Sequence, residues 1–344
     1  MPDIKIHEVS KYFGKVRALK NASLHVKDGE YVVLLGPSGC GKTTLLKAIA
    51  GIIEPSAGKI VVGGSDITRL PPEDRHIGFV FQNYALFPHM SVLDNASYGM
   101  LSRGELPDRA RGVATKMLEI VHLENRLDAL PRELSGGMQQ RLAVGRALAT
   151  GSKLLLLDEP TNALDAYLRV ELRNELRKMA KRLGLTAIHV THDQEEAMAI
   201  ADKIVVMKNA TILQVGTPSE VYDKPASPFI ANFIGEANFF YVVFEKGKGK
   251  LLGKAIRRKL EGEYIAVIRP ENLTLGTKGS PVKLISKVKL GPYYRYEVLC
   301  DERPIKVRSH RDCSKATHVQ FSPDKVLFFK EPPEGLEKSL QATG

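Results

Sequence analysis

The chain has 344 residues, a length that predicts about two domains, and its 43% hydrophobic content excludes a wholly disordered protein. Its formal net charge of +11 favours an acidic partner, such as a phosphate, a nucleic acid or a membrane surface. The excess is uneven, because residues 1–235 carry 29 basic and 26 acidic side chains, whereas residues 236–344 carry 21 and 13.

Cysteine content and apolar segments narrow the class of protein further. Cys40, Cys300 and Cys313 show no paired spacing, so we expect no disulfide framework and a reducing compartment. The N-terminal segment lacks the apolar stretch of a secretory signal, and no apolar run reaches the roughly 18–20 residues that span a bilayer. We therefore expect any work at a membrane to proceed through a partner.

The chain begins with short β-like stretches at 4–9 and 22–26. Residues 31–35 form an apolar run without polar alternation, which is typical of a strand buried on both faces. A glycine-rich loop and then a helical stretch at 43–50 come next. This order of strand, loop and helix is the context in which a phosphate-binding loop is found.

The loop matches the pattern G-x-x-x-x-G-K-[ST]. Its glycines allow backbone N–H groups to face phosphate oxygens, and the helix N-terminus adds partial positive charge. We expect Lys42 to contact the β- and γ-phosphates and the Thr43 hydroxyl to bind Mg²⁺. The predicted nucleotide-binding residues are Gly36, Pro37, Ser38, Gly39, Cys40, Gly41, Lys42, Thr43 and Thr44.

Three further apolar runs, which we predict as strands, each end in polar residues. Ligands of doubly wound sheets bind beyond the carboxyl ends of strands, so we expect these residues to converge on the loop. Asp158 can hold the metal ion, and Glu159 can polarise the attacking water. The runs and their polar ends are 76–81 with Gln82, 154–157 with Asp158 and Glu159, and 186–190 with Thr191 and His192.

A second anion-binding device is predicted at Ser135, Gly136 and Gly137, where a helix can begin. A serine hydroxyl, glycine amides and a helix N-terminus together suit a phosphate. Taken alone, the segment is better explained as an ordinary serine cap. Residues 168–183 carry Leu and Met at helical spacing, which predicts an amphipathic helix whose apolar stripe is core.

The composition changes near Pro225, and short β-like segments punctuated by Gly and Pro follow Gly235. We predict two domains, 1–235 and 236–344, with a helical subdomain at about 84–150 inside the first. The segments of the second domain predict an all-β fold, a small barrel or a sandwich. Its aromatic and basic residues form no array that would predict nucleic-acid binding.

Six ordered elements of residues 4–235 together resemble the ATP-binding cassette of ABC transporters. They are the phosphate-binding loop, Gln82, Leu134–Met138, Leu154–Pro160, Ala163–Asp165 and His192. The resemblance implies an α/β P-loop NTPase fold that binds ATP and Mg²⁺ and hydrolyses ATP. It assigns catalysis to Glu159, His192, Gln82 and Lys42, and it makes Thr43, Gln82 and Asp158 the metal-binding residues.

The resemblance also implies a head-to-tail homodimer, or a dimer with a close paralogue. ATP would lie between the loop of one subunit and Ser135–Gly137 of the other, with Asp165 at the interface. Phe13 would stack on the adenine, with Tyr12 as the fallback. Met138 stands where the family has Gln, but the phosphate contacts come mainly from the serine and the glycines, so we expect activity to survive.

Residues 84–89, 233–239 and 268–272 resemble the importer subgroup that takes up maltose, spermidine, sulfate or molybdate, and ferric iron. The resemblance implies an oligonucleotide-binding-like (OB-like) regulatory domain, two integral-membrane permease subunits and a solute-binding protein. The chain would lie at the cytoplasmic face of the cell membrane, and no nucleic-acid partner is expected. The alternative is a soluble ABC ATPase acting on nucleic acid or ribosomes, which the single P-loop and the compact β tail disfavour.

Overall fold

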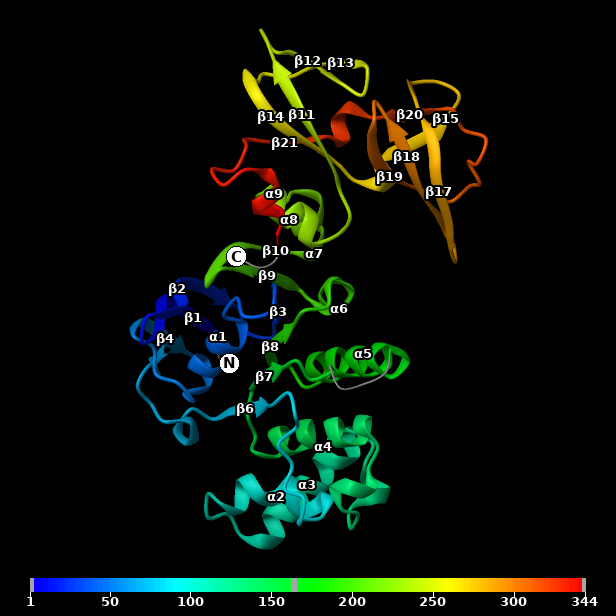
Figure 1. Ribbon diagram of the computed structural model, residues 1–344. Coiled ribbons are helices and arrows are strands. Elements are labelled where there is room, and N and C mark those ends of the chain that lie inside the picture. Colours follow the sequence, from blue (N-terminus) through cyan, green and yellow to red (C-terminus); the bar gives the residue numbers. More distant parts are fainter. Residues whose placement is uncertain (1–2, 162–165, 342–344) are drawn as a thin grey trace. The chain divides into compact units, whose positions relative to one another are not determined.

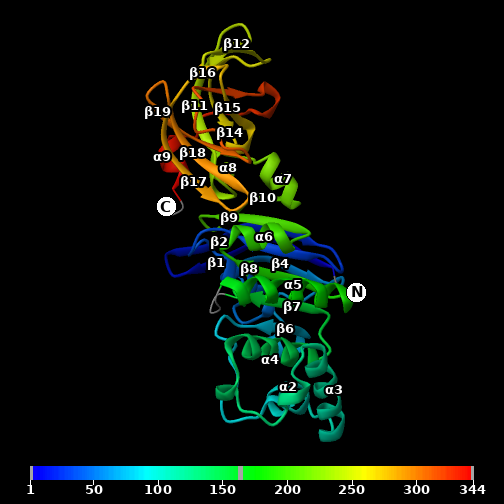
Figure 2. The ribbon, with the colours of Figure 1, turned by 90° about the vertical axis from the view of Figure 1, so that its right-hand side faces the viewer.

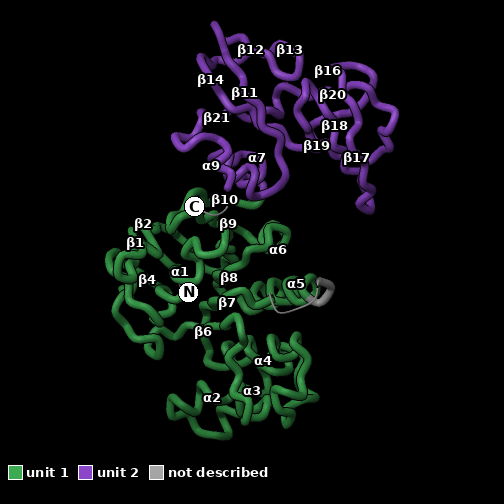
Figure 3. Tube along the Cα trace, in the orientation of Figure 1, with its two compact units in different colours: residues 1–218, 343 green, residues 219–342, 344 purple. Residues whose placement is uncertain are grey.

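The computed structural model describes residues 3–161 and 166–341 of the chain (Figure 1). They belong to two compact units, Met1–Pro218 and Ser219–Ala342, which Figure 3 colours green and purple. Each unit has its own hydrophobic core. In these described ranges, no helix is both long enough and apolar enough to cross a membrane.

The first unit is organised around a six-stranded sheet. Its strands, in order across the sheet, are β10 (Thr211–Gly216), β9 (Lys203–Lys208), β3 (Tyr31–Leu35), β8 (Thr186–Thr191), β7 (Leu154–Asp158) and β6 (Ile77–Val80). The strands from β9 to β6 pair in parallel, whereas β10 pairs antiparallel with β9. Every residue of β3, β7 and β8 is buried, which explains why these strands are mostly apolar and do not alternate with exposed polar residues.

A smaller antiparallel sheet and one helix share the core of this sheet. The sheet consists of β2 (Val16–Val26), β1 (Ile4–Phe13), β4 (Ala57–Val62) and β5 (Ser65–Asp66), in that order, and the helix is α1 (Lys42–Ala50). The common core includes Ile6 and Ile60 from the small sheet, Leu45 from α1, and Val32 and Val190 from the large sheet. Helix α1 is therefore fixed between the two sheets, directly after the phosphate-binding loop.

The described residues of the first unit form five further α-helices. They are α2 (Val92–Leu101), α3 (Pro107–Ile120), α4 (Gly136–Ala149), α5 (Ala166–Arg182) and α6 (Gln194–Ile200). Helices α2, α3 and α4 contact one another, within the span that the sequence assigns to a helical subdomain. Helices α2 and α4 each begin after a serine, Ser91 and Ser135, whose hydroxyl accepts a backbone N–H of the first turn.

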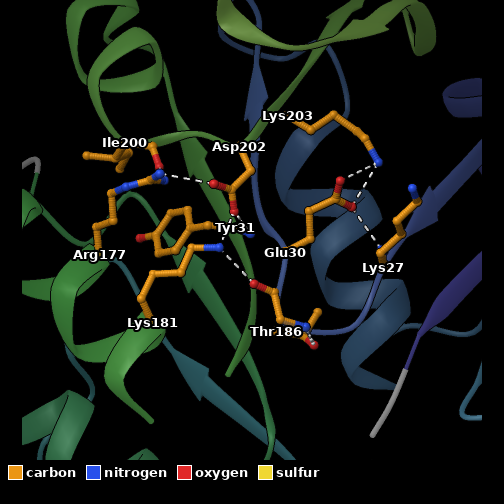
Figure 4. A network of polar contacts seen from close by, with 10 residues as sticks. Lys27, Glu30, Tyr31, Arg177, Lys181, Thr186, Ile200, Asp202 and Lys203 are labelled. Carbon is orange, nitrogen blue, oxygen red and sulfur yellow. Dashed lines mark hydrogen bonds and ion pairs between the residues drawn. The ribbon is translucent and has the colours of Figure 1, made fainter. Parts of the chain in front are cut away.

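A polar network fastens the large sheet at the amino end of β3. The Asp202 carboxylate accepts hydrogen bonds from the Tyr31 backbone N–H at 2.8 Å and from the Arg177 guanidinium at 3.0 Å. Lys181 also pairs with Asp202, and Figure 4 shows these side chains together. The network ties β3 to α5 and to the start of β9, and so holds the sheet at the edge opposite to the phosphate-binding loop.

The second unit consists mainly of antiparallel strands, which Figure 2 shows from a second side. They pair in four small sheets and share one core. Closure of these sheets into an OB-like barrel stays a prediction. The sheets are β11 (Asn238–Phe244), β14 (Gly262–Ile268) and β21 (Leu327–Phe329); β12 (Lys248–Leu251) and β13 (Lys254–Arg257); β15 (Leu273–Gly276), β20 (His318–Phe321) and β16 (Ser280–Pro281); and β17 (Lys283–Leu290), β18 (Tyr293–Cys300) and β19 (Arg303–Ser309). The helices are α7 (Pro218–Asp223), α8 (Pro228–Phe233) and α9 (Leu336–Leu340).

The two units divide at Pro218, earlier than the boundary expected at Gly235. The reason is that α8 packs against α9 and β14 of the second unit. Arg269 strengthens this attachment, because its buried guanidinium donates hydrogen bonds to the backbone carbonyls of Tyr222 and Ala231. The change of composition near residue 225 therefore lies inside the second unit and does not mark its start.

Candidate nucleotide-binding site

The phosphate-binding loop connects β3 to α1, and two of its glycines have no room for a side chain. A Cβ atom on Gly36 would lie 2.3 Å from the Met207 carbonyl oxygen. A Cβ atom on Gly41 would lie 2.5 Å from the Ala18 carbonyl oxygen, and Gly41 also has a left-handed φ of 104°. The path of the loop therefore requires glycine at both positions.

Lys42 is buried at the start of α1, with only 5% of its surface exposed. Its ammonium group donates hydrogen bonds to the carbonyl oxygens of Gly36 at 2.8 Å and Pro37 at 2.9 Å. Phosphate oxygens are ionised and therefore stronger acceptors than these carbonyls. A nucleotide can thus take over the lysine's hydrogen bonds. Burial raises the pKa of the neighbouring Cys40 thiol, so Cys40 acts as a small neutral filler.

Thr43 and Asp158 together offer oxygen atoms to a metal ion. The Thr43 hydroxyl donates a hydrogen bond to Asp158 Oδ1 at 2.9 Å, which joins the first turn of α1 to the end of β7. Burial raises the pKa of Asp158, and a nearby cation would favour its ionised form again. Mg²⁺ in nucleotide sites takes one or two protein oxygens together with phosphate and water oxygens. The hydroxyl and the carboxylate fit that requirement.

Glu159 lies between Gln82 and His192. Its Oε2 atom is 3.5 Å from Gln82 Nε2 and 3.5 Å from His192 Nδ1. These residues follow β7, β6 and β8, and parallel pairing brings the carboxyl ends of those strands to one edge. The Glu159 backbone has a φ of 47°, and its N–H donates a hydrogen bond to the Val190 carbonyl at 3.0 Å. The acid and the histidine are therefore close enough to act on one water molecule.

Two aromatic side chains at the end of β1 are available for an adenine ring. Phe13 is 50% exposed and Tyr12 is 48% exposed, so exposure does not distinguish between them. The Lys11 ammonium lies 5.1 Å from the centre of the Phe13 ring. Stacking of adenine on Phe13 stays a prediction.

The signature segment Ser135–Gly137 lies at the start of α4 and is not joined to the phosphate-binding loop. Ser135 and Gly136 are exposed, and the Ser135 hydroxyl accepts the Met138 backbone N–H at 3.4 Å. No hydrogen bond or ion pair within 3–161 and 166–341 links this segment to Lys42 or its loop. Asp165, which we expect at a dimer interface, lies outside the described residues.

Sequence reasoning missed two buried residues behind the site, Glu196 and Thr161. The sequence from Asp193 to Glu196 has the spacing of a capping box at a helix start, and the Asp193 carboxylate does accept the Glu196 backbone N–H at 3.1 Å. The Glu196 side chain does not reach back to the cap. It accepts hydrogen bonds from Thr161 and Thr191 instead. Because the position of Glu196 is explained by a capping box, the sequence pattern did not predict its hydrogen bonds with Thr161 and Thr191.

Comparison with known proteins identifies the family of this chain. The family profile described as ABC transporter matches residues 19–162. An Fe(3+) ions import ATP-binding protein of Rhizobium etli is 44% identical over 89% of this chain and 90% of its own length. The chain belongs to the ABC transporter family. A protein of the same name from Agrobacterium fabrum is 44% identical over 95% of both chains, and a sulfate/thiosulfate import ATP-binding protein of Chromobacterium violaceum is 46% identical over 81% of this chain and 77% of its own length.

Solved structures extend the similarity of this ABC protein to three dimensions. One is a dimeric ATP-binding cassette in a post-hydrolysis state with ADP and phosphate, with 32% identity, a TM-score of 0.56 and coverage of 62% of this chain and 98% of the other. Another is cbiO1 of Clostridium perfringens, part of the ABC transporter complex cbiONQ, with 32% identity, a TM-score of 0.59 and coverage of 63% and 89%. The first unit therefore has the P-loop NTPase fold of an ABC cassette. The protein is an ABC-type ATPase that uses ATP with Mg²⁺.

Proposed function

We propose that this chain is the ATP-hydrolysing subunit of a binding-protein-dependent importer. The observation that carries the proposal is the convergence of Lys42, Asp158, Glu159 and His192 at one edge of the large sheet. Lys42 and the loop amides hold the phosphates, and Glu159 accepts a proton from the attacking water. His192 orients the γ-phosphate. Mg²⁺, when bound at Thr43 and Asp158, supplies positive charge against the phosphates.

The proposed working form is a head-to-tail dimer. Ser135 and Gly136 are exposed and are not joined to the loop of their own chain, which supports contact with ATP held by a second subunit. A helix N-terminus with free amides suits the γ-phosphate. ATP binding would close the dimer and hydrolysis would reopen it, with Asp165 at the interface.

The proposed partners are two membrane permease subunits and, through them, a solute-binding protein. The ferric-iron and sulfate importer names of the relatives support this assignment. The chain would then lie at the cytoplasmic face of the membrane, held there by the permeases. We propose an inorganic ion as the solute, because those relatives align over most of this chain, with a polyamine or a sugar as the competing outcomes of the test.

Mixing two inactive variants tests the dimer directly. Lys42→Ala disables the loop, Ser135→Arg blocks the signature segment, and both are placed in a Glu159→Gln background that retains ATP. Neither variant alone should form an ATP-dependent dimer. Their mixture should, and it should retain one ATP per dimer, because one of its two composite sites is intact. A site built within a single chain would leave the mixture monomeric.

Uptake tests the transport assignment. The chain is combined in proteoliposomes with the permease and solute-binding proteins encoded beside it, and the accumulation of ferric ion, sulfate, spermidine and maltose is compared. We expect one solute to stimulate ATP hydrolysis and to accumulate. An ATPase that responds to RNA or ribosomes and to no permease would refute the importer assignment.

A further inference from the structure

A buried carboxylate behind the nucleotide site joins the ends of two strands. Glu196, in α6, is 1% exposed. Its Oε1 accepts a hydrogen bond from the Thr161 hydroxyl at 3.0 Å, and its Oε2 accepts one from the Thr191 hydroxyl at 2.6 Å. Both threonines are buried. Thr161 follows Glu159 by two positions, and Thr191 directly precedes His192, so one side chain holds both segments that carry the proposed catalytic pair.

Two buried rings lie on the other side of this carboxylate. His189 Nε2 is 3.8 Å from Glu196 Oε1, and His189 Nδ1 shares a 2.9 Å hydrogen bond with the Tyr31 hydroxyl. Burial lowers the pKa of His189, so its ring is neutral. The 3.8 Å between His189 Nε2 and Glu196 Oε1 exceeds hydrogen-bond distance, and Nε2 makes no hydrogen bond within the described residues. The Tyr31 backbone N–H in turn donates a hydrogen bond to Asp202 in the network of Figure 4.

The chemistry of this cluster favours positioning over simple filling of space. Burying a charge costs free energy unless the charge is hydrogen-bonded. An apolar side chain of similar volume commonly makes the folded protein more stable. What a carboxylate adds is fixed distances to two hydroxyl donors. The separation of 3.5 Å between Glu159 Oε2 and His192 Nδ1 depends on the relative position of the same two strand ends.

We propose that Glu196 is a positioning residue for ATP hydrolysis, which acts through Thr161 and Thr191 to set the distance between Glu159 and His192. The inference rests on the proposed function, since it assumes that Glu159 acts on the water that attacks ATP. Glu196 itself touches no reacting atom.

Threonine variants separate the hydrogen bonds from the packing. Thr161→Val and Thr191→Val keep the shape of the side chain and remove the hydroxyl, whereas Thr161→Ser and Thr191→Ser keep the hydroxyl. We expect each valine variant to lower kcat roughly 10- to 100-fold, because small displacements of catalytic groups cost this much. Affinity for ATP, measured by equilibrium binding, should stay at the wild-type value. The serine variants should recover most of the rate.

A carboxylate variant and a matched control complete the design. Glu196→Gln keeps the size of the side chain, but it replaces one acceptor oxygen by an NH₂ group, which cannot accept a hydrogen bond. One of the two threonine hydroxyls then loses its acceptor, so kcat should fall as in one valine variant. Combining it with Thr161→Val should add less than the product of the two separate effects, since both break the same link. Glu195→Gln, at the exposed neighbouring position, should leave kcat unchanged.

Three results would overturn the inference alone, and a fourth would refute the proposed function. Valine variants that fold and turn over ATP at the wild-type kcat overturn the inference. A parallel loss of ATP affinity, or the same loss of kcat in the serine variants, also overturns it and assigns the cluster to structure alone. A wild-type chain that shows no hydrolysis of MgATP refutes the proposed function first, and the inference with it.

Discussion

We compare one buried cation from each unit, Lys42 and Arg269, which are held in similar ways and which we expect to serve different ends. Lys42 and Arg269 are each 5% exposed, and each donates hydrogen bonds to backbone carbonyls. The acceptors of Lys42 lie five and six positions earlier, in its own loop. The acceptors of Arg269 lie 33 to 47 positions away, on the helices and linker that precede β11.

The difference in sequence separation decides what each cation can do. Local carbonyls can release an ammonium group to a phosphate without separating any two elements of the fold. Distant carbonyls cannot release a guanidinium without detaching a segment. We therefore expect Lys42 to serve ligand binding and Arg269 to serve stability. The variants below test this contrast, from the largest expected effect to the smallest.

The largest effect is expected for Lys42→Ala. Removal of the cation should abolish productive ATP binding and lower kcat/KM by more than about 10³-fold, because the phosphates lose a charge-assisted contact. The midpoint of urea unfolding should fall only modestly, because the buried carbonyls that lose a donor lie in the same loop and no distant segments are separated. Equilibrium ATP binding and ATPase assays check the first expectation, and unchanged ATP affinity would contradict it.

Glu159→Gln should lower kcat by about 10³-fold while ATP binding survives, because the amide cannot accept a proton from the attacking water. The variant should accumulate as an ATP-bound dimer, which size-exclusion chromatography detects. Lys42→Ala should show no such dimer, so the two variants separate binding from hydrolysis. Near-normal turnover in Glu159→Gln would remove this residue from the catalytic step.

Arg269→Met should show the reverse pattern of Lys42→Ala. We expect the free energy of unfolding to fall by about 2–4 kcal/mol, since buried carbonyls lose a charged donor. ATP affinity of the folded protein should remain normal. Arg311→Met, at an exposed position of the same unit, is the matched control and should be neutral in urea unfolding. Loss of ATP binding without loss of stability would break the comparison.

The smallest effect concerns a cation at the surface, Lys287, which pairs with a carboxylate and not with carbonyls. Lys287 and Ser314 hold the pKa of Asp312 well below its ordinary value of 3.8. A lowered pKa in the folded state gives stability that is present above about pH 4 and is lost as the pH falls. Asp312→Asn should remove this acid-dependent part, seen as a flatter decline of the urea midpoint between about pH 5 and pH 2. If the urea midpoint declines identically in the wild type and in Asp312→Asn, the pair of Lys287 and Asp312 does not contribute to the pH dependence of stability.

Local patterns in the sequence predicted much of the first unit. The strand 31–35, the loop from Gly36 and the helix after it were predictable, because consecutive residues carry the whole pattern. The polar ends of β6, β7 and β8 were predictable because parallel strands bring their carboxyl ends together. The roles of the individual site residues stay predictions until the variants are measured.

The division at Pro218 could not be predicted from composition, because it depends on contacts of α8 and Arg269 with partners far along the chain. The strands of the second unit were predictable as a class, since Gly and Pro divide this part of the chain into short β-like segments. Their pairing was not, because each ladder joins segments whose register depends on the common core.

The sequence by itself determined that this chain binds a nucleotide, because a phosphate-binding loop is made of neighbouring residues whose backbone and charges act together. Only the tertiary structure decided that Glu196 faces Thr161 and Thr191 and that Arg269 closes on distant carbonyls. Those choices depend on which way a buried side chain turns, and packing between remote segments settles that direction.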